Sequence, residues 1–193
     1  MIKMQLVDAI KARKSVKRFS EKKPDWRTVI QCIDAGRYAP MAGNMFSLKF
    51  ILVSDEKKID ELVDASQQKF VKAPYVLVIV SDDAKVVRSY DNRGKGYSRQ
   101  QAGAAIENIL LALTDKGLAT CWVGYFEDSQ VKRALKIPND MNVEALLPIG
   151  FETKVSTGQP KSKPDLEDVL YFETWKNKYM TKDTKVQVFG NLT

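Results

Sequence analysis

Two groups of basic residues have the right types and spacing to hold a dianionic phosphate. They lie in "RKSVKRF" (13–19) and "PKSK" (160–163), and their polar members are Arg13, Lys14, Ser15, Lys17, Lys161 and Lys163. Guanidinium and ammonium groups make charge-assisted hydrogen bonds to phosphate oxygens, and a serine hydroxyl adds a further donor. Each group taken alone is explained equally well as a solvated basic surface, because charged side chains are mostly exposed.

The chain contains no histidine, which excludes Ser-His-Asp and Cys-His catalysis and any imidazole metal ligand. Its two cysteines, Cys32 and Cys121, stand apart in apolar surroundings without C-x-x-C spacing. This pattern predicts two buried thiols rather than a disulfide or a metal site. We therefore expect no bound metal, and we expect a cofactor to supply the chemistry.

Length and composition favour one domain of 193 residues with a core of its own, since 44% of the residues are hydrophobic. The apolar runs are far shorter than the ~20 residues that span a bilayer, and the N-terminus lacks the pattern of a cleaved signal. These features predict a cytoplasmic protein without membrane contact. The net charge of +7 raises a polyanion-binding module as an alternative, but 24 acidic residues are mixed with the 31 basic ones, so nucleic acid is not the expected partner.

Hydrophobic periodicity predicts helices alternating with strands. Leu6, Val7 and Ile10 indicate a first helix, with Arg13 and Lys14 in its last turn. Further predicted helices are one capped by Asp25 with Val29, Ile30 and Ile33 on one face, one around 59–63, one over 98–116 ended by Gly117, one capped by Asp128, and one around 166–175.

Strands are predicted at 49–54, at 73–81 in the centre of the sheet, at 119–124 and at 143–151. Pro148 favours an edge or end position for the last of these. Residues 82–97 and 155–165 are predicted loops, and "KVQVF" (185–189) is a strand that could pair with a second subunit. The alternation predicts an α/β layered domain.

The order of five short motifs resembles the flavin-dependent nitroreductase family. They are R-x-S-x-K-x-F at 13–19, A-P-x-x-x-N at 39–44, an A-P before the strand at 73–81, G-L-x-x-x-W-x-G at 117–124, and the basic pair at 161–163. The resemblance covers about residues 5–175. It implies a three-layer α-β-α sandwich with a mixed central sheet (α/β, or α+β in some schemes), in a single domain 1–193 whose arm 176–193 is exchanged in a homodimer.

The resemblance also implies a set of FMN contacts. Arg13 and Ser15 match positions that hold the phosphate and ribityl chain, with Lys14 between them and Lys17 at the pyrimidine edge of the flavin. Lys161 and Lys163 match a second phosphate-binding pair, and Gln68 matches an amide that contacts the ring. Val123 and Gly124 match a strand end that offers backbone N–H groups to the flavin N5 region. The other subunit would contribute Pro40, Met41, Ala42 and Asn44.

These roles agree with physical chemistry. A cation such as Lys17 would stabilise the negative charge of a reduced flavin, and Gly124 has no side chain to keep the ring from the backbone. Two departures from the family pattern concern the pocket over the flavin: Met41 replaces a common serine, and Phe46, Ser47 and Leu48 replace glutamine, proline and tryptophan. Tyr90, Arg93 and Tyr97 are either substrate-lid residues or ordinary loop residues.

The activity implied is a ping-pong oxidoreductase that takes electrons from NADH or NADPH and passes them to a small acceptor such as a nitroaromatic or a quinone. The flavin carries the chemistry, so no catalytic side chain is assigned. Relatives with dehalogenating or flavin-fragmenting activity, such as dimethylbenzimidazole synthase, leave those reactions open as alternatives.

Overall fold

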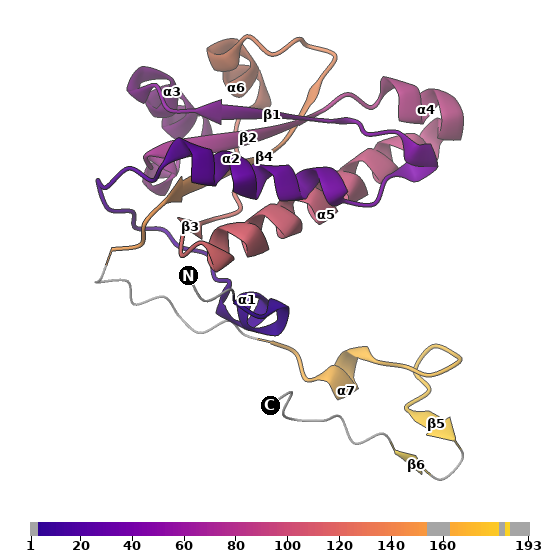
Figure 1. Cartoon of the computed structure of the whole chain (residues 1–193). Coiled ribbons are helices and arrows are strands. Elements are labelled where there is room, and N and C mark those ends of the chain that lie inside the picture. The colour runs from indigo at the N-terminus through magenta and orange to yellow at the C-terminus, as the bar shows by residue number, and fades with distance from the viewer. Residues whose placement is uncertain (1–3, 154–162, 182–183, 186–193) are drawn as a thin grey trace. The chain divides into compact units, whose positions relative to one another are not determined.

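The computed structural model describes residues 4–153, 163–181 and 184–185 (Figure 1). The chain divides into two compact units, Met1–Gly158 and Gln159–Thr193. The first unit holds the sheet and its helices, and it also holds most of the residues that the sequence singles out.

A four-stranded sheet forms the centre of the first unit, in the order β1-β2-β4-β3. The strands are β1 (Leu48–Val53), β2 (Tyr75–Ser81), β3 (Ala119–Thr120) and β4 (Asn142–Gly150). All three ladders are antiparallel, and the one parallel bridge among the described residues joins Ser15 to Thr120. The prediction that "YVLVIV" forms a central strand is confirmed, because β2 lies between β1 and β4 and is buried along its whole length.

Helices cover both faces of this sheet, which confirms the predicted layered α/β fold (Figure 1). On one face α2 (Trp26–Asp34) and α5 (Gly94–Asp115) pack against Tyr75, Leu77 and Ile79 of β2. On the other face α3 (Glu56–Ser66) and α6 (Asp128–Leu135) pack against the alternate β2 residues, Val76, Val78 and Val80. A strand buried on both faces reads as a continuous apolar run, as β2 does.

Local chemistry sets the helix ends. The Asp25 carboxylate accepts a hydrogen bond from the Arg27 N–H at 2.9 Å, so Asp25 caps α2 as predicted. Asp55 caps α3 in the same way, through the Lys58 N–H. Gly117 follows α5 at φ +67°, a left-handed conformation that glycine adopts without a Cβ clash. Asp128, predicted as a cap, is instead the first residue of α6, whose cap position is Glu127.

The predicted loop over 82–97 is wrong. This stretch contains α4 (Ala84–Tyr90), the short 3-10 helix η4 (Asp91–Arg93) and the first turn of α5. Val86 anchors α4 in the core. Gly94 allows the two helices to meet, because a Cβ there would lie 2.5 Å from the Val87 Cα. The turn-forming residues "DNRGKG" thus make a close helix junction rather than a long loop.

The predicted strand at 119–124 is shorter than expected. β3 ends at Thr120, and the chain returns to β4 only at Val123, which exchanges two 3.0 Å backbone hydrogen bonds with Leu146. Pro148 lies between these two points of contact. It has no N–H to donate toward the strand on that side, so the ladder is interrupted there. Of the two positions predicted for Pro148, the sheet edge is wrong, because β4 is an inner strand. The strand end is confirmed, because the proline lies near the end of β4 beside a gap in its pairing.

The predicted apolar face of α1 (Leu6–Ala12) is exposed in this structure, whereas that of α2 buries Val29, packs Ile33 against the core and exposes only Ile30. Leu6, Val7 and Ile10 project from α1, where Ala9 is the buried residue, and Ile30 of α2 is 47% exposed. Arg13 and Lys14 lie just beyond α1 rather than in its last turn. Three more 3-10 turns complete the first unit: η1 (Ala35–Tyr38), η2 (Ala42–Asn44) and η3 (Lys69–Val71).

The second unit contains α7 (Leu166–Val169) and a small antiparallel pair, β5 (Tyr179–Thr181) with β6 (Thr184–Lys185). Tyr171 packs edge-on against Trp175 with ring centroids 4.7 Å apart, and Lys178 lies over the Tyr171 ring. The helix predicted over 166–175 is thus a single turn. The rest of "KVQVF" lies outside the described residues, as do residues 154–162. Among the residues that are described, no helix has both the length and the apolar character needed to cross a membrane.

Candidate functional site

The segment 13–17 lies beside β3 as a short extra strand. Ser15 and Thr120 form a parallel bridge, and the Val16 N–H donates to the Thr120 carbonyl oxygen at 2.9 Å. In extended backbone, successive side chains point to opposite faces. The odd-numbered residues 13, 15 and 17 therefore share one face, while 14 and 16 point to the other.

The odd-numbered face meets the Cys121 thiol. The Ser15 hydroxyl and the charges of Lys17 and Arg13 act on that thiol. Burial is the largest influence and raises the pKa of Cys121 above its ordinary value, while Ser15 and the two cations lower it. Three predicted cofactor residues are thus gathered around one buried sulfur.

Arg13 is held in place but is only partly satisfied. Its side chain is 13% exposed, and its Nε lies 3.5 Å from a carboxylate oxygen of Glu107 on α5. The Nε nevertheless has no hydrogen-bond acceptor among the described residues. A buried donor without an acceptor is costly, so this guanidinium is suited to receive an anion.

The chain brings three more predicted residues, Gln68, Val123 and Gly124, to the same end of β3. The Gln68 side-chain amide donates to the Tyr125 carbonyl oxygen at 3.1 Å, and the Lys17 ammonium lies 5.0 Å from the centre of the Phe70 ring. We call Arg13, Ser15, Lys17, Gln68, Val123 and Gly124 the β3-end cluster.

Val123 and Gly124 differ in what they can offer a ligand. Val123 is buried and its N–H already donates to Leu146. The Gly124 N–H has no acceptor among the described residues, and a Cβ built on Gly124 would meet nothing within 4 Å. Of the two predicted backbone donors, Gly124 is the one that remains available, and it faces open space.

Lys14 lies away from the β3-end cluster. Its ammonium is 2.8 Å from the Glu152 carboxylate, on the side of the segment that also carries Val16. Lys14, Glu152 and Thr120 line a separate small cavity of about 140 Å³. The structure thus does not bring Lys14 together with Arg13, Ser15 and Lys17.

The 40–44 turn, which contains Pro40, Met41, Ala42 and Asn44, is a second and separate part of the predicted site. Gly43 and Asn44 both have φ of +56°, and Asn44 is exposed. The Tyr90 hydroxyl lies close to Gly43, and the Tyr90 ring packs on Tyr97 in the first turns of α5. Arg13 meets α5 ten residues further on, at Glu107, which is about 15 Å along the helix axis at 1.5 Å per residue.

The second predicted phosphate-binding pair is Lys161 and Lys163, and the structure does not relate these residues to the β3-end cluster. Lys161 lies outside the described residues, and Lys163 belongs to the second compact unit. Both remain predictions from the resemblance alone.

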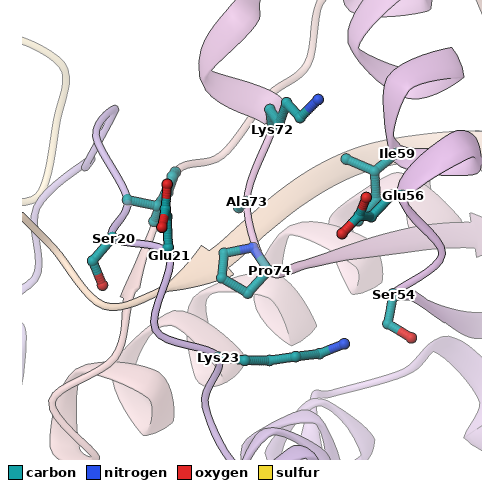
Figure 2. Close-up of a pocket in the computed structure, with 10 residues that line it drawn as sticks. Ser20, Glu21, Lys23, Ser54, Glu56, Ile59, Lys72, Ala73 and Pro74 are labelled. Carbon is teal, nitrogen blue, oxygen red and sulfur yellow. The ribbon is translucent and has the colours of Figure 1, made fainter.

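A cavity of about 490 Å³ lies elsewhere, between residues 19–23, the start of α3 and the start of β2. Figure 2 shows Lys23, Glu56 and Lys72 around Pro74 in this cavity. Its lining mixes acidic and basic side chains, and the Lys72 ammonium is paired with Asp60 at 2.7 Å. None of the predicted cofactor residues lines it, and the mixed charge does not favour a phosphate.

Sequence reasoning gave no role to two residues beside the cluster, Cys121 and Phe70. Cys121 was expected only as a buried thiol, and it is 5% exposed. Phe70 follows Gln68 in a 3-10 turn that no hydrophobic periodicity marks.

Comparison with known proteins shows what this chain is similar to. The nitroreductase family model matches residues 10–72 and 61–151. A solved nitroreductase family protein from Clostridium novyi is 30% identical, with 94% of this chain and 100% of that chain covered and a TM-score of 0.72.

Two further proteins are similar over most of their length. Iodotyrosine deiodinase of Thermotoga neapolitana is 24% identical over 185 residues, which cover 82% of this chain and 94% of the deiodinase. The NADPH:FMN oxidoreductase of Vibrio harveyi, solved with NAD+, shares the fold with a TM-score of 0.75 at 21% identity, covering 91% of this chain and 80% of that one. The chain belongs to the nitroreductase family, whose members are oxidoreductases.

Proposed function

We propose that this protein is an FMN-dependent oxidoreductase of the cytoplasm that uses NADH or NADPH to reduce small nitroaromatic or quinone-type acceptors in a ping-pong cycle. The observation that carries the proposal is that Arg13, Ser15 and Lys17 share one face of the segment beside β3 and act on the same buried thiol. Gly124, a few residues after β3, faces open space.

The residues present fit FMN. Arg13 is a largely buried cation whose Nε has no hydrogen-bond acceptor among the described residues, which suits a phosphate. Ser15 adds a hydroxyl beside it. Gly124 leaves room for a flat ring and has an N–H free to donate. Together they provide an anion-binding end and an open end, as a phosphorylated flavin requires.

Each side chain then has a distinct task. Arg13 and Ser15 would bind the phosphate and ribityl oxygens, and Lys17 would place its charge at the pyrimidine edge. Gln68 is held by Tyr125 and would orient its amide toward the ring. When bound, FMN supplies hydride transfer from the nicotinamide and onward electron transfer to the acceptor. Because the flavin would carry the chemistry, catalysis would not require a histidine, and the chain has none.

The names of similar proteins support the cofactor and the donor. The Vibrio harveyi protein is an NADPH:FMN oxidoreductase, and its structure contains NAD+. Its similarity to this chain is one of fold alone. It supports FMN as the cofactor of this chain only when it is taken together with the residues of the β3-end cluster.

We further propose a homodimer in which each flavin site combines the β3-end cluster of one subunit with the 40–44 turn of the other. The separation of the two parts along α5 supports this division. So do the exposed apolar side chains of the first unit, since large exposed apolar patches mark interaction surfaces. Among them are Leu6, Val7, Ile10, Trp26, Ile30 and Tyr38.

A complementation experiment tests the shared site. Arg13→Ala and Asn44→Ala chains are purified with different tags, mixed after dissociation and isolated as heterodimers. If the site is shared, one site of each heterodimer has both Arg13 and Asn44 intact and binds FMN with wild-type affinity. If each site lies within one chain, no intact site forms and neither site reaches that affinity.

Visible spectroscopy tests the cofactor and the reaction together. The purified protein should show flavin absorption that is released on denaturation. Under anaerobic conditions NADH or NADPH should bleach that absorption, and a nitroaromatic or quinone should restore it. A protein that remains colourless and cannot be loaded with FMN would overturn the proposal.

Reductive dehalogenation is a second candidate, favoured by the similarity to iodotyrosine deiodinase over 94% of that enzyme. The two candidates differ in their products. Release of iodide from an iodinated tyrosine by the chemically reduced protein, without bleaching by either nicotinamide, would favour dehalogenation over the first proposal.

A further inference from the structure

Gln101 joins two elements that lie far apart in the sequence. It belongs to the buried face of α5 and is 4% exposed, beside small apolar residues such as Ala102 and Ala105. Its side-chain oxygen Oε1 accepts two hydrogen bonds from Ser47, one from the N–H at 2.9 Å and one from the hydroxyl at 2.7 Å. A backbone N–H can only donate, so the Gln101 atom that it meets must be the amide oxygen rather than the nitrogen.

Ser47 forms the base of the 40–44 turn. It comes three residues after Asn44 and directly before β1, and it is 5% exposed. Its carbonyl oxygen accepts the Asp82 N–H, which follows β2, at 2.8 Å. The proline that Ser47 replaces in the family pattern has no N–H to donate. In this chain the serine therefore provides a link to α5 that a proline could not make.

The Gln101 amide nitrogen has no comparable partner. Nε2 of Gln101 and the hydroxyl of Ser98, one helical turn apart on α5, are both buried without a hydrogen-bond partner among the described residues. A buried amide with an unpaired donor is costly, and an apolar side chain at position 101 would avoid that cost. The part of Gln101 that this chain uses is therefore the oxygen, which holds Ser47.

The helix α5 thus contacts both parts of the proposed site. Glu107 lies 3.5 Å from the Arg13 Nε of the β3-end cluster, and Gln101 holds the base of the 40–44 turn. The two contacts are about 9 Å apart along the helix axis at 1.5 Å per residue. Removing the Gln101 contact should therefore release the turn while leaving Arg13 in place.

We propose that Gln101 is a positioning residue of the flavin site: its side-chain oxygen holds Ser47 against α5 and so fixes the 40–44 turn that one subunit presents to the flavin of its partner. This inference rests on the proposed function and on its shared site. Gln101 acts through the turn rather than on the cofactor, because its side chain is buried whereas Asn44 is exposed.

The first test compares FMN affinities of cofactor-free protein by fluorescence titration. Gln101→Met has a similar length but no acceptor for Ser47, and it should weaken FMN binding about three- to tenfold, the effect of one hydrogen bond of ordinary strength. Gln101→Glu keeps an acceptor oxygen and should bind as the wild type does. A Gln101→Glu variant as weak as Gln101→Met would overturn the proposal.

Ile106→Val is the matched control for a loss of stability alone. Ile106 is also buried on α5, and shortening it lowers the stability of the core without changing a hydrogen bond. Its FMN affinity should equal that of the wild type. An equal loss of affinity in Ile106→Val and Gln101→Met would show that FMN binding merely follows the stability of α5, which contradicts a positioning role.

A double-mutant cycle tests whether Gln101 acts through Ser47. Ser47→Ala removes the hydroxyl donor and keeps the N–H, so it should weaken FMN binding about two- to fivefold. Adding Ser47→Ala to Gln101→Met should cause no further loss. Losses that multiply fully would refute the proposal. Wild-type affinity in Ser47→Ala alone would do the same, and this result can be obtained even if Gln101→Met does not fold.

Heterodimers show on which flavin Gln101 acts. Gln101→Met and Arg13→Ala chains are paired in the same way as the Arg13→Ala and Asn44→Ala chains above. If Gln101 positions the turn for the partner's flavin, one site combines an intact cluster with an intact turn and binds FMN with wild-type affinity. If Gln101 acts through Glu107 on Arg13 of its own chain, no site is intact and the proposal fails.

Two outcomes separate this inference from the proposals on which it rests. Failure of the wild type to bind FMN would overturn the proposed function itself. FMN binding by the wild type without an intact site in the Arg13→Ala and Asn44→Ala heterodimer would overturn the shared site and, with it, the role of Gln101. An intact site in that heterodimer but none in the Gln101→Met and Arg13→Ala heterodimer would overturn the role of Gln101 alone.

Discussion

The β3-end cluster and the 40–44 turn are two parts of one predicted site, and they are built in opposite ways. The cluster is assembled from segments far apart in the sequence, and its central side chains are buried or held by named partners, such as Glu107 for Arg13 and Tyr125 for Gln68. The turn is local and exposed, and it is shaped by its own backbone at Gly43 and Asn44.

This difference shows which part is prepared for a ligand within one chain. The cluster already holds a cation with an unsatisfied donor beside an open space, so little reorganisation is needed when an anion binds. The turn offers an exposed surface with Asn44 at its end, which becomes a site only when something covers it. Each prediction below changes one part and leaves the other as it is.

The largest effect is expected from Arg13→Ala. Loss of a charge-assisted hydrogen bond costs about 1.5–3 kcal/mol, so FMN affinity should fall about 10- to 150-fold. Titration of cofactor-free protein measures this loss.

Lys14→Ala is the matched control for Arg13→Ala. Its ion pair with Glu152 is partly exposed and lies on the opposite side of the segment, and such pairs contribute about 0–1 kcal/mol to stability. FMN affinity should therefore stay close to the wild-type value. Equal losses for the two variants would show that the alternation of side chains along 13–17 does not select the contacts.

Gly124→Ala should separate binding from folding. The new methyl group would occupy open space, so the free energy of unfolding should not change. It would also stand where the ring is proposed to lie, and steric overpacking costs about 1–3 kcal/mol. We expect weaker FMN binding with unchanged urea unfolding of the cofactor-free protein. Full FMN affinity in this variant would place the ring elsewhere.

The sequence allowed good prediction where one physical signal dominates. The short β-branched apolar run of β2 is typical of a strand buried on both faces, and the wide apolar stripe of α5, with Ala102, Ile106 and Ile109, is typical of a buried helix. Both features depend on local pattern and could be predicted. The order of the motifs singled out Arg13, Lys14, Ser15 and Lys17 together, and it gave no sign that Lys14 would lie apart from the other three.

Features that depend on a tertiary partner could not be predicted in the same way. Nothing in "DNRGKG" shows that Gly94 will meet Val87, so a helix junction looked like a loop. The periodicity of Leu6, Val7 and Ile10 predicts a helix but does not show that those side chains remain exposed within one chain. The bridge between Ser15 and Thr120, which places residues 13–17 beside β3, likewise has no signal in the local sequence.

Gly43→Ala should change the free energy of unfolding, whereas Gly124→Ala should change FMN binding. At φ +56° an alanine is strained by about 1–2 kcal/mol, and its Cβ would lie 2.8 Å from the Tyr90 hydroxyl oxygen. The free energy of unfolding should therefore fall by about that amount. Urea unfolding of the cofactor-free protein tests this, with Gly124→Ala as its control. An unchanged midpoint would mean that the turn can rearrange without cost.

The last effect is absent near neutral pH: it concerns the two buried thiols and appears only at high pH. Burial raises the pKa of Cys32 from 9.0 to about 11. Above about pH 9 the unfolded chain loses this proton while the folded chain keeps it, so stability should fall as the pH rises from about 9 to about 11. Cys32→Ala removes this contribution, and its unfolding free energy should fall less steeply over that range than that of the wild type. Urea unfolding at several pH values measures both slopes, since all other groups titrate alike in the two proteins. Parallel slopes would mean that the Cys32 thiol reaches water in the folded chain, and Cys121, whose pKa burial also raises, would then be the first thiol to test in the same way.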